Sequence, residues 1–271
     1  MTSPKTIRVV APARPLDPAY RDRLVEIMAT GKWPGLTLQF DEQCFYHHNH
    51  FAGTDEQRLS ALVAAANDPE VDIIWFARGG YGSLRLLPEL LDKLSPEASS
   101  KAYIGYSDMG FLFGALYREK IGQCVHGPMP GDLARTDGEK AIHRVFDFLS
   151  STGSPPGATP VVAFNLTVLT ALIATPYAPD LEGHILCLED VGEYQYRLDR
   201  SMATLHANGM LGRLAGIKPG RFSHVPIDEG DVPFGPSALE IVDAWCRRAG
   251  IPLLSAADIG HDVENDLIAF G

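Results

Sequence analysis

The run from Asp72 to Ala77 is short and apolar throughout its centre, and a glycine-rich segment follows it directly. A strand without polar alternation is typical of a parallel sheet that helices cover on both faces. Further strands are expected at 7–11, at 36–40 and around Tyr103, and they alternate with helices expected at 18–29, 54–66, 84–93 and 111–117. This alternation predicts an α/β fold whose N-terminal domain has a doubly wound, mostly parallel, flavodoxin-like sheet.

The character of the chain changes after about residue 136. A helix expected at 140–149 leads into residues 150–157, which are rich in Ser, Gly and Pro and are typical of an interdomain linker. Beyond it we expect helices at 166–174, 199–208 and 236–249, and strands at 185–188, 214–217 and 252–258. We therefore predict an N-terminal domain (1–136), a helix and linker (137–164) and a smaller C-terminal α/β domain (165–271).

Charge and cysteine usage exclude several classes of function. The chain of 271 residues has a formal net charge of −11 and no local basic patch, which argues against a nucleic-acid or anionic-membrane partner. Its four cysteines are far apart, without a CxxC pair, and lie in apolar surroundings, so we expect buried free thiols rather than a zinc site or a disulfide framework. We see no signal peptide and no apolar run of membrane-spanning length, so the expected compartment is the cytoplasm.

The sequence Gly105-Tyr106-Ser107-Asp108 ends a short expected strand immediately before an apolar, helix-compatible segment. A serine on such a turn projects from the carboxyl edge of the sheet, close to the free N–H groups of the next helix, which can bind an oxyanion. Met109 stands where a lipase-type Gly-x-Ser-x-Gly motif has its second glycine. Ser107 is therefore either a nucleophile or an ordinary N-cap of the helix.

A second chemically suggestive segment is Arg78-Gly79-Gly80-Tyr81-Gly82-Ser83, which directly follows the apolar strand. Its glycines let the backbone turn sharply and present N–H groups to an anion. A phosphate loop is disfavoured because neither Gly-Lys-Ser/Thr nor Gly-x-Gly-x-x-Gly is present. A bare structural turn remains open. The third interpretation is one wall of an oxyanion hole that faces Ser107 from a neighbouring strand, and it explains both motifs together.

A serine nucleophile needs a base, usually an imidazole held by a carboxylate. Of the nine histidines, the cluster at 47–50 lacks a partnering carboxylate at helical spacing, so we do not expect a metal site there. His126 and His261 both follow apolar segments, where a catalytic side chain would be presented. Glu189 ends another apolar strand and is a candidate carboxylate. Periodicity alone does not select Glu189 and His261 over their rivals.

Taken together, these segments resemble the LD-carboxypeptidase family of serine peptidases, also called the S66 or murein tetrapeptide carboxypeptidase family. The resemblance runs in the family's order over nearly the whole chain. The matching segments are 52–58, 77–82, 104–108, 126–129, 165–169, 188–193, 196–200 and 260–261. It implies a cleft between a domain that bears the serine and a domain that bears the glutamate and the histidine.

The resemblance also implies roles for individual residues. Ser107 corresponds to the nucleophile, His261 to the base and Glu189 to the carboxylate that orients the base. The backbone N–H groups of Gly80 and Asp108 correspond to the oxyanion hole. The family is commonly dimeric, so a homodimer is expected, and it needs no metal or cofactor.

The chemistry implied by the resemblance is hydrolysis of an L,D-peptide bond. A muropeptide tetrapeptide would lose its terminal D-Ala, which follows meso-diaminopimelate, in peptidoglycan recycling. A cationic side chain should bind the free carboxylate of this small peptide substrate, and either Arg78 or Arg85 would suit. Two other functions stay open: hydrolysis of microcin C-type peptide-nucleotides for self-immunity, and non-catalytic binding of cell-wall peptides.

Overall fold

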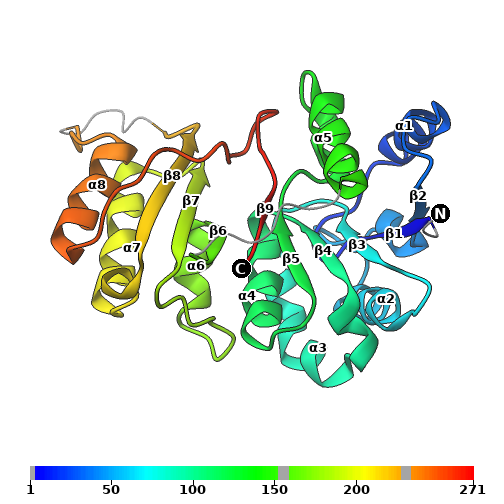
Figure 1. Ribbon diagram of the computed structural model, residues 1–271, viewed down its shortest axis with the longest axis horizontal. Coiled ribbons are helices and arrows are strands. Elements are labelled where there is room, and N and C mark those ends of the chain that lie inside the picture. Colours follow the sequence, from blue (N-terminus) through cyan, green and yellow to red (C-terminus); the bar gives the residue numbers. More distant parts are fainter. Residues whose placement is uncertain (1–3, 152–158, 227–232) are drawn as a thin grey trace.

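Two sheets lie side by side in the computed structural model, which describes residues 4–151, 159–226 and 233–271 (Figure 1). The larger sheet has the strand order β2-β1-β3-β4-β5-β9, and the smaller one has the order β6-β7-β8. Strands β1 to β5 are mutually parallel, in the doubly wound order that the sequence predicts. The bounds of the strands in the larger sheet are β1 Lys5–Val10, β2 Leu36–Phe40, β3 Ile73–Phe76, β4 Ala102–Gly105, β5 Gln123–His126 and β9 Ile268–Ala269.

Helices cover both faces of the larger sheet. Their bounds are α1 Pro18–Ala29, α2 Asp55–Asn67, α3 Leu87–Lys93, α4 Gly110–Arg118 and α5 Gly138–Ser150. On one face, Ile74 and Phe76 of β3 belong to the core that α2, α3 and α4 cover. On the other face, Ile73 and Trp75 belong to the core that α1 and α5 cover. Strand β3 is apolar throughout because its alternate side chains enter two different cores.

The smaller sheet is also parallel, and its helices are α6 Leu166–Leu172, α7 Gln195–Ala207 and α8 Ala238–Ala249. Its strands are β6 Val161–Asn165, β7 Ile185–Val191 and β8 Gly216–Ser223. The prediction of a strand at 252–258 is wrong. Only a single bridge forms there, between Leu253 and Ile217, because Pro252 has no N–H to donate and the chain bends at Ser255.

The chain passes between the two units twice. Helix α5, in the expected segment 137–164, packs on the larger sheet, whereas β6 at the end of that segment belongs to the smaller sheet. Residues 152–158 of the expected linker lie outside the described residues. Near the C-terminus, β9 returns to pair antiparallel with β5 at the edge of the larger sheet. Phe270 then packs against Phe113 of the first unit and Phe164 of the second.

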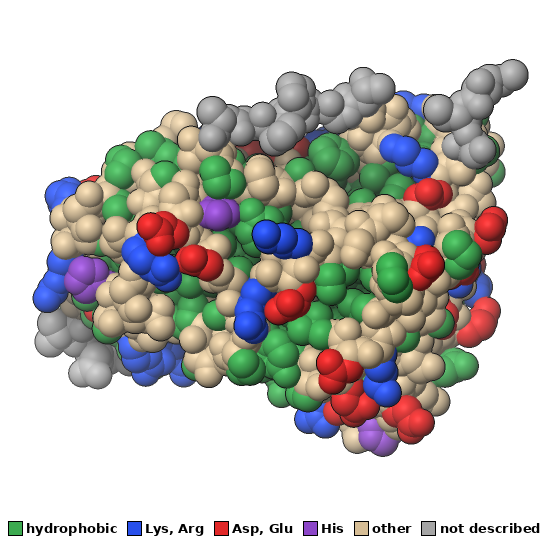
Figure 2. Space-filling view, turned by 60° about the horizontal axis from the view of Figure 1, so that its bottom comes forward, with side chains coloured by type: hydrophobic (Ala, Val, Ile, Leu, Met, Phe, Trp, Pro, Cys, Tyr) green, Lys and Arg blue, Asp and Glu red, His purple; other side chains and the backbone are tan. Residues whose placement is uncertain are grey.

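The outer surface is mixed in charge. On the face that Figure 2 presents, acidic and basic side chains are interspersed rather than gathered in a basic patch. All four cysteines are buried and free, as expected from their apolar surroundings. No helix among the described residues is both long and apolar enough to cross a membrane.

Candidate active site

Ser107 lies on the tight turn that the sequence predicts between β4 and the next helix. Strand β4 ends at Gly105, a short 3-10 helix spans Ser107–Met109, and α4 begins at Gly110. The backbone of Ser107 is in the left-handed region, with φ of 61°. A non-glycine residue there is strained, and such strain is typical of a nucleophile on a strand-to-helix turn.

The two other residues of the expected triad lie directly beside this serine. His261 Nε2 is 3.1 Å from Ser107 Oγ, and His261 Nδ1 is 2.7 Å from Glu189 Oε2. The Glu189 side chain is fully buried, while the His261 side chain keeps 12% of its surface exposed. The structure thus brings the three residues together in one hydrogen-bonded chain, in which Nδ1–H donates to the carboxylate and Nε2 can accept from the hydroxyl.

A local irregularity in the smaller sheet aims Glu189 at His261. The pairing of β7 with β8 shifts register between Leu188 and Asp190, so Glu189 sits at a bulge, a feature that re-aims side chains. Asp190 then accepts hydrogen bonds from Asn165 and from Thr167, which fixes the start of α6. The segment beginning at Asn165 therefore has a supporting structural role.

The loop that carries His261 is held on both sides. Asn265 Oδ1 accepts from the Gly260 N–H at 3.0 Å, and His126 Nε2 lies 3.1 Å from the same oxygen. Because that oxygen is an acceptor, His126 must carry its proton on Nε2. Arg221 of β8 forms a two-point ion pair with Asp262, next to the histidine. The loop is thus tied to β5 and to β8 at once.

Burial of His126 makes the protein sensitive to acid. Burial lowers the pKa of His126 from its ordinary value of 6.5 to about 4. As pH falls below 6.5, the unfolded chain binds a proton that the folded chain refuses, so folding stability is lost until about pH 4. At about 1.4 kcal/mol per pKa unit, the loss is about 3 kcal/mol. Urea unfolding at pH 7 and pH 4 should show this extra loss in the natural chain relative to His126→Gln, and equal losses in both would contradict it.

The glycine-rich loop lies against the serine, as the adjacency of β3 and β4 requires. The Gly79 backbone approaches so closely that a Cβ atom there would stand 3.2 Å from Ser107 Cβ. Ser83 donates its backbone N–H to the Asp108 carboxylate at 2.9 Å and its hydroxyl to the Asp108 carbonyl at 2.6 Å. The loop and the serine turn are therefore fastened together, which brings Gly80 and Asp108 to neighbouring strand ends. Burial raises the pKa of the Asp108 carboxyl.

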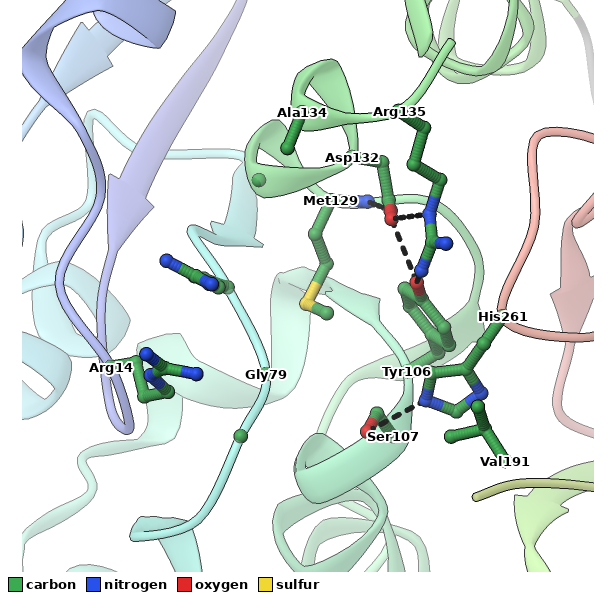
Figure 3. Close-up of a pocket in the computed structure, with 13 residues that line it drawn as sticks. Arg14, Gly79, Tyr106, Ser107, Met129, Asp132, Ala134, Arg135, Val191 and His261 are labelled. Carbon is green, nitrogen blue, oxygen red and sulfur yellow. Dashed lines mark hydrogen bonds and ion pairs between the residues drawn. The ribbon is translucent and has the colours of Figure 1, made fainter. Parts of the chain in front are cut away.

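A pocket of about 580 Å³ opens in front of Ser107 and His261 (Figure 3). It is lined by Arg14, Arg78, Gly79, Gly80, Tyr106, Ser107, Met129, Gly131, Asp132, Ala134, Arg135, Val191 and His261. Val191 and His261 come from the second unit and the other residues from the first, so the pocket lies where the units meet. Of the two arginines expected to bind substrate, Arg78 lines this pocket, whereas Arg85 lies outside it and pairs with Asp55 at 2.6 Å.

Comparison with known proteins places this arrangement in a family. The sequence model of the LD-carboxypeptidase N-terminal domain matches residues 7–127, and that of the C-terminal domain matches residues 159–271. The chain belongs to the LD-carboxypeptidase family. It is accordingly a serine-type carboxypeptidase, as the resemblance of its motifs implies.

Individual members and solved structures agree with this assignment. A putative carboxypeptidase of Synechocystis is 34% identical over 242 residues, which cover 83% of this chain and 77% of that protein. The murein tetrapeptide carboxypeptidase of Pseudomonas aeruginosa is 29% identical over 83% of this chain and 78% of that protein. The crystal structure of muramoyltetrapeptide carboxypeptidase from Oxalobacter formigenes has a TM-score of 0.82 at 25% identity, covering 98% of this chain and 93% of that one. The microcin C7 self-immunity protein MccF has a TM-score of 0.80 at 17% identity, covering 100% of this chain and 92% of that one, which shows a shared fold alone.

Sequence reasoning missed several residues of this LD-carboxypeptidase pocket. Arg14 belongs to none of the motifs, although its place just after β1, at the carboxyl edge of the sheet, is a usable signal. Asp132 and Arg135 pair at 2.9 Å, and Asp132 also accepts from the Tyr106 hydroxyl at 2.7 Å. No sequence pattern marks Asn265, because its role depends on a hydrogen bond to His126, which lies 139 residues earlier in the chain.

Proposed function

We propose that this chain is an LD-carboxypeptidase that releases the terminal D-Ala of a muropeptide tetrapeptide through an acyl-enzyme. The observation that carries the proposal is the hydrogen-bonded chain from Ser107 through His261 to Glu189, whose first two members line the pocket. The names of two relatives, a murein tetrapeptide carboxypeptidase and a muramoyltetrapeptide carboxypeptidase, support the substrate class.

In the proposed reaction, Ser107 Oγ attacks the carbonyl carbon of the bond that precedes D-Ala, while its proton passes to His261 Nε2. Glu189 keeps the other ring nitrogen protonated and stabilises the imidazolium. The backbone N–H groups of Gly80 and Asp108 bind the developing oxyanion. His261 then gives its proton to the departing amine, and the C–N bond breaks. Water, deprotonated by His261, hydrolyses the ester and frees Ser107.

The pocket offers little support for a peptide-nucleotide substrate. Trp33 and Trp75 are buried in the core on the α1 and α5 side of the larger sheet, and Trp245 of α8 donates to Asp199 at 2.8 Å. None of the three tryptophans lines the pocket, and among the described residues that do line it, Tyr106 is the sole Phe, Tyr or Trp. An adenine would need such a ring to stack on.

The proposal is tested by incubating the purified protein with synthetic muropeptide tri-, tetra- and pentapeptides and measuring free D-Ala. We expect release from the tetrapeptide and at most slow release from the others. An aminoacyl sulfamoyl adenylate serves as the competing substrate. Cleavage of that compound without D-Ala release would show that the substrate class is wrong, while tight peptide binding without any hydrolysis would show a binding protein.

A further inference from the structure

The pocket holds more positive than negative charge, although the chain as a whole is strongly acidic. Three arginines and one aspartate line it. The aspartate, Asp132, is already bound by Arg135 and by the Tyr106 hydroxyl, and it also accepts the Met129 N–H at 2.8 Å. Within residues 4–151, 159–226 and 233–271, neither Arg14 nor Arg78 pairs with a carboxylate. Two cations in the pocket therefore have no carboxylate partner among the described residues.

Both arginines stand on the wall that carries the glycine-rich loop. The Arg14 side chain crosses the backbone of Gly80 so closely that any Cβ atom there would collide with it. Gly80 has φ of 114°, a conformation that favours glycine, and its neighbour Gly79 abuts Ser107. In Figure 3, Arg14 lies on the other side of Gly79 from Ser107 and His261. A ligand that reaches the serine thus faces this wall.

The loops bearing the two arginines are fixed relative to each other. The buried guanidinium of Arg58 donates to the Pro12 carbonyl in the loop after β1 and, at 3.0 Å, to the Gly82 carbonyl in the loop after β3. Arg14 and Arg78 come from these same two loops. The fold therefore places both arginines on neighbouring loops of one pocket, at the electrostatic cost of two like charges.

That cost is visible at Arg78. Burial, and then the charge of Arg14, lower the pKa of the Arg78 guanidinium from its ordinary value. Asp132, Asp17 and Tyr20 act in the opposite direction without overcoming it. An anion bound between the two arginines would reverse this cost, and a guanidinium is well suited to bind a carboxylate through two parallel hydrogen bonds.

We propose that Arg14 and Arg78 form a subsite for a carboxylate of the peptide substrate, and that this subsite makes the enzyme act at chain ends. The inference rests on the proposed function, because it assigns the subsite to the same peptide. Two carboxylates could fill the subsite. One is the terminal carboxylate of D-Ala, a single residue beyond the carbonyl that Ser107 attacks. The other is the side-chain carboxylate of the preceding diaminopimelate.

Binding to a Ser107→Ala variant tests the subsite without any turnover. Calorimetry would compare the tetrapeptide with its C-terminal amide, and with a peptide that has lysine in place of diaminopimelate. We expect the tetrapeptide, which has both carboxylates, to bind about 10- to 100-fold more tightly than the peptide that lacks the carboxylate bound by the subsite. This difference in affinity is typical of one charge-assisted hydrogen-bonded contact. Arg14→Gln keeps the stem over Gly80 and should abolish that preference.

Arg118→Gln is the matched control, because this exposed arginine at the far end of α4 pairs with Glu119 and does not line the pocket. It should leave the preference unchanged. If Arg14→Gln abolishes the preference for the tetrapeptide over its C-terminal amide, the subsite binds the terminal carboxylate. If it abolishes the preference for the tetrapeptide over the lysine peptide, the subsite binds the diaminopimelate side chain. If Arg14→Gln and Arg78→Gln leave both preferences intact, or if neither carboxylate matters to the parent, the subsite is disproved. Failure of the proposed function appears separately, as absence of D-Ala release by the natural chain.

Discussion

Ser107→Ala is expected to reduce D-Ala release from the tetrapeptide to background. The substitution removes the hydroxyl that lies 3.1 Å from His261 Nε2 and that attacks the substrate in the proposed reaction, so no covalent intermediate can form. Loss of the nucleophile in such a triad costs on the order of 10⁶-fold in turnover. D-Ala release measured over hours, with enzyme in large excess, sets the lower limit of detection.

The folded state of this variant should be nearly unchanged. Ser107 is at a turn rather than in either core, and alanine has the same difficulty as serine in adopting φ of 61°. Far-UV circular dichroism and the melting temperature should match those of the parent within a few degrees, a shift that corresponds to about 1 kcal/mol. Measurable turnover by a folded, carefully purified Ser107→Ala protein would refute the assignment of the nucleophile.

Glu189→Gln is expected to lower turnover by about 10³- to 10⁴-fold, the size of the loss when a serine protease triad loses its orienting carboxylate. The Glu189 carboxylate accepts a hydrogen bond from the Nδ1–H of His261. A glutamine amide can instead donate to Nδ1, which moves the ring proton to Nε2. In that tautomer the imidazole cannot take a proton from Ser107, although the geometry is preserved.

The stability of Glu189→Gln separates this effect from misfolding. Because the native carboxylate is fully buried, removing its charge relieves a desolvation cost and should not weaken the fold strongly. Asp190→Asn is the useful companion, since this neighbouring carboxylate fixes the start of α6 and does not contact His261. Its main effect should be on the melting temperature. Turnover of Glu189→Gln within about twofold of the parent would rule out an orienting role.

The architecture of the first unit could be predicted because its signals are local. A continuous apolar run such as β3 specifies a doubly covered strand, and the alternation of strands with helices specifies the parallel order. The spacing of Thr54 and Gln57 is also that of a capping box, and the structure has this capping box at the start of α2. The contact between the glycine-rich loop and Ser107 followed from the expected adjacency of β3 and β4.

Other features could not be predicted because they depend on contacts between distant segments. Strand β9 has two residues and exists only through its pairing with β5, more than 140 residues earlier. The segment 252–258 has the composition of a strand, but it pairs with β8 through a single β-bridge. Family resemblance, and not a sequence pattern, indicates the roles of Glu189 and His261, because their contact with Ser107 depends on how the two units pack.

Intact-protein mass spectrometry after reaction with a fluorophosphonate, a reagent that phosphonylates activated serines, tests the central claim most directly. We predict one adduct per chain, located by peptide mapping at Ser107, and slowed by several orders of magnitude in His261→Ala. An adduct on another residue, or full reactivity of Ser107 without the imidazole, would contradict the account.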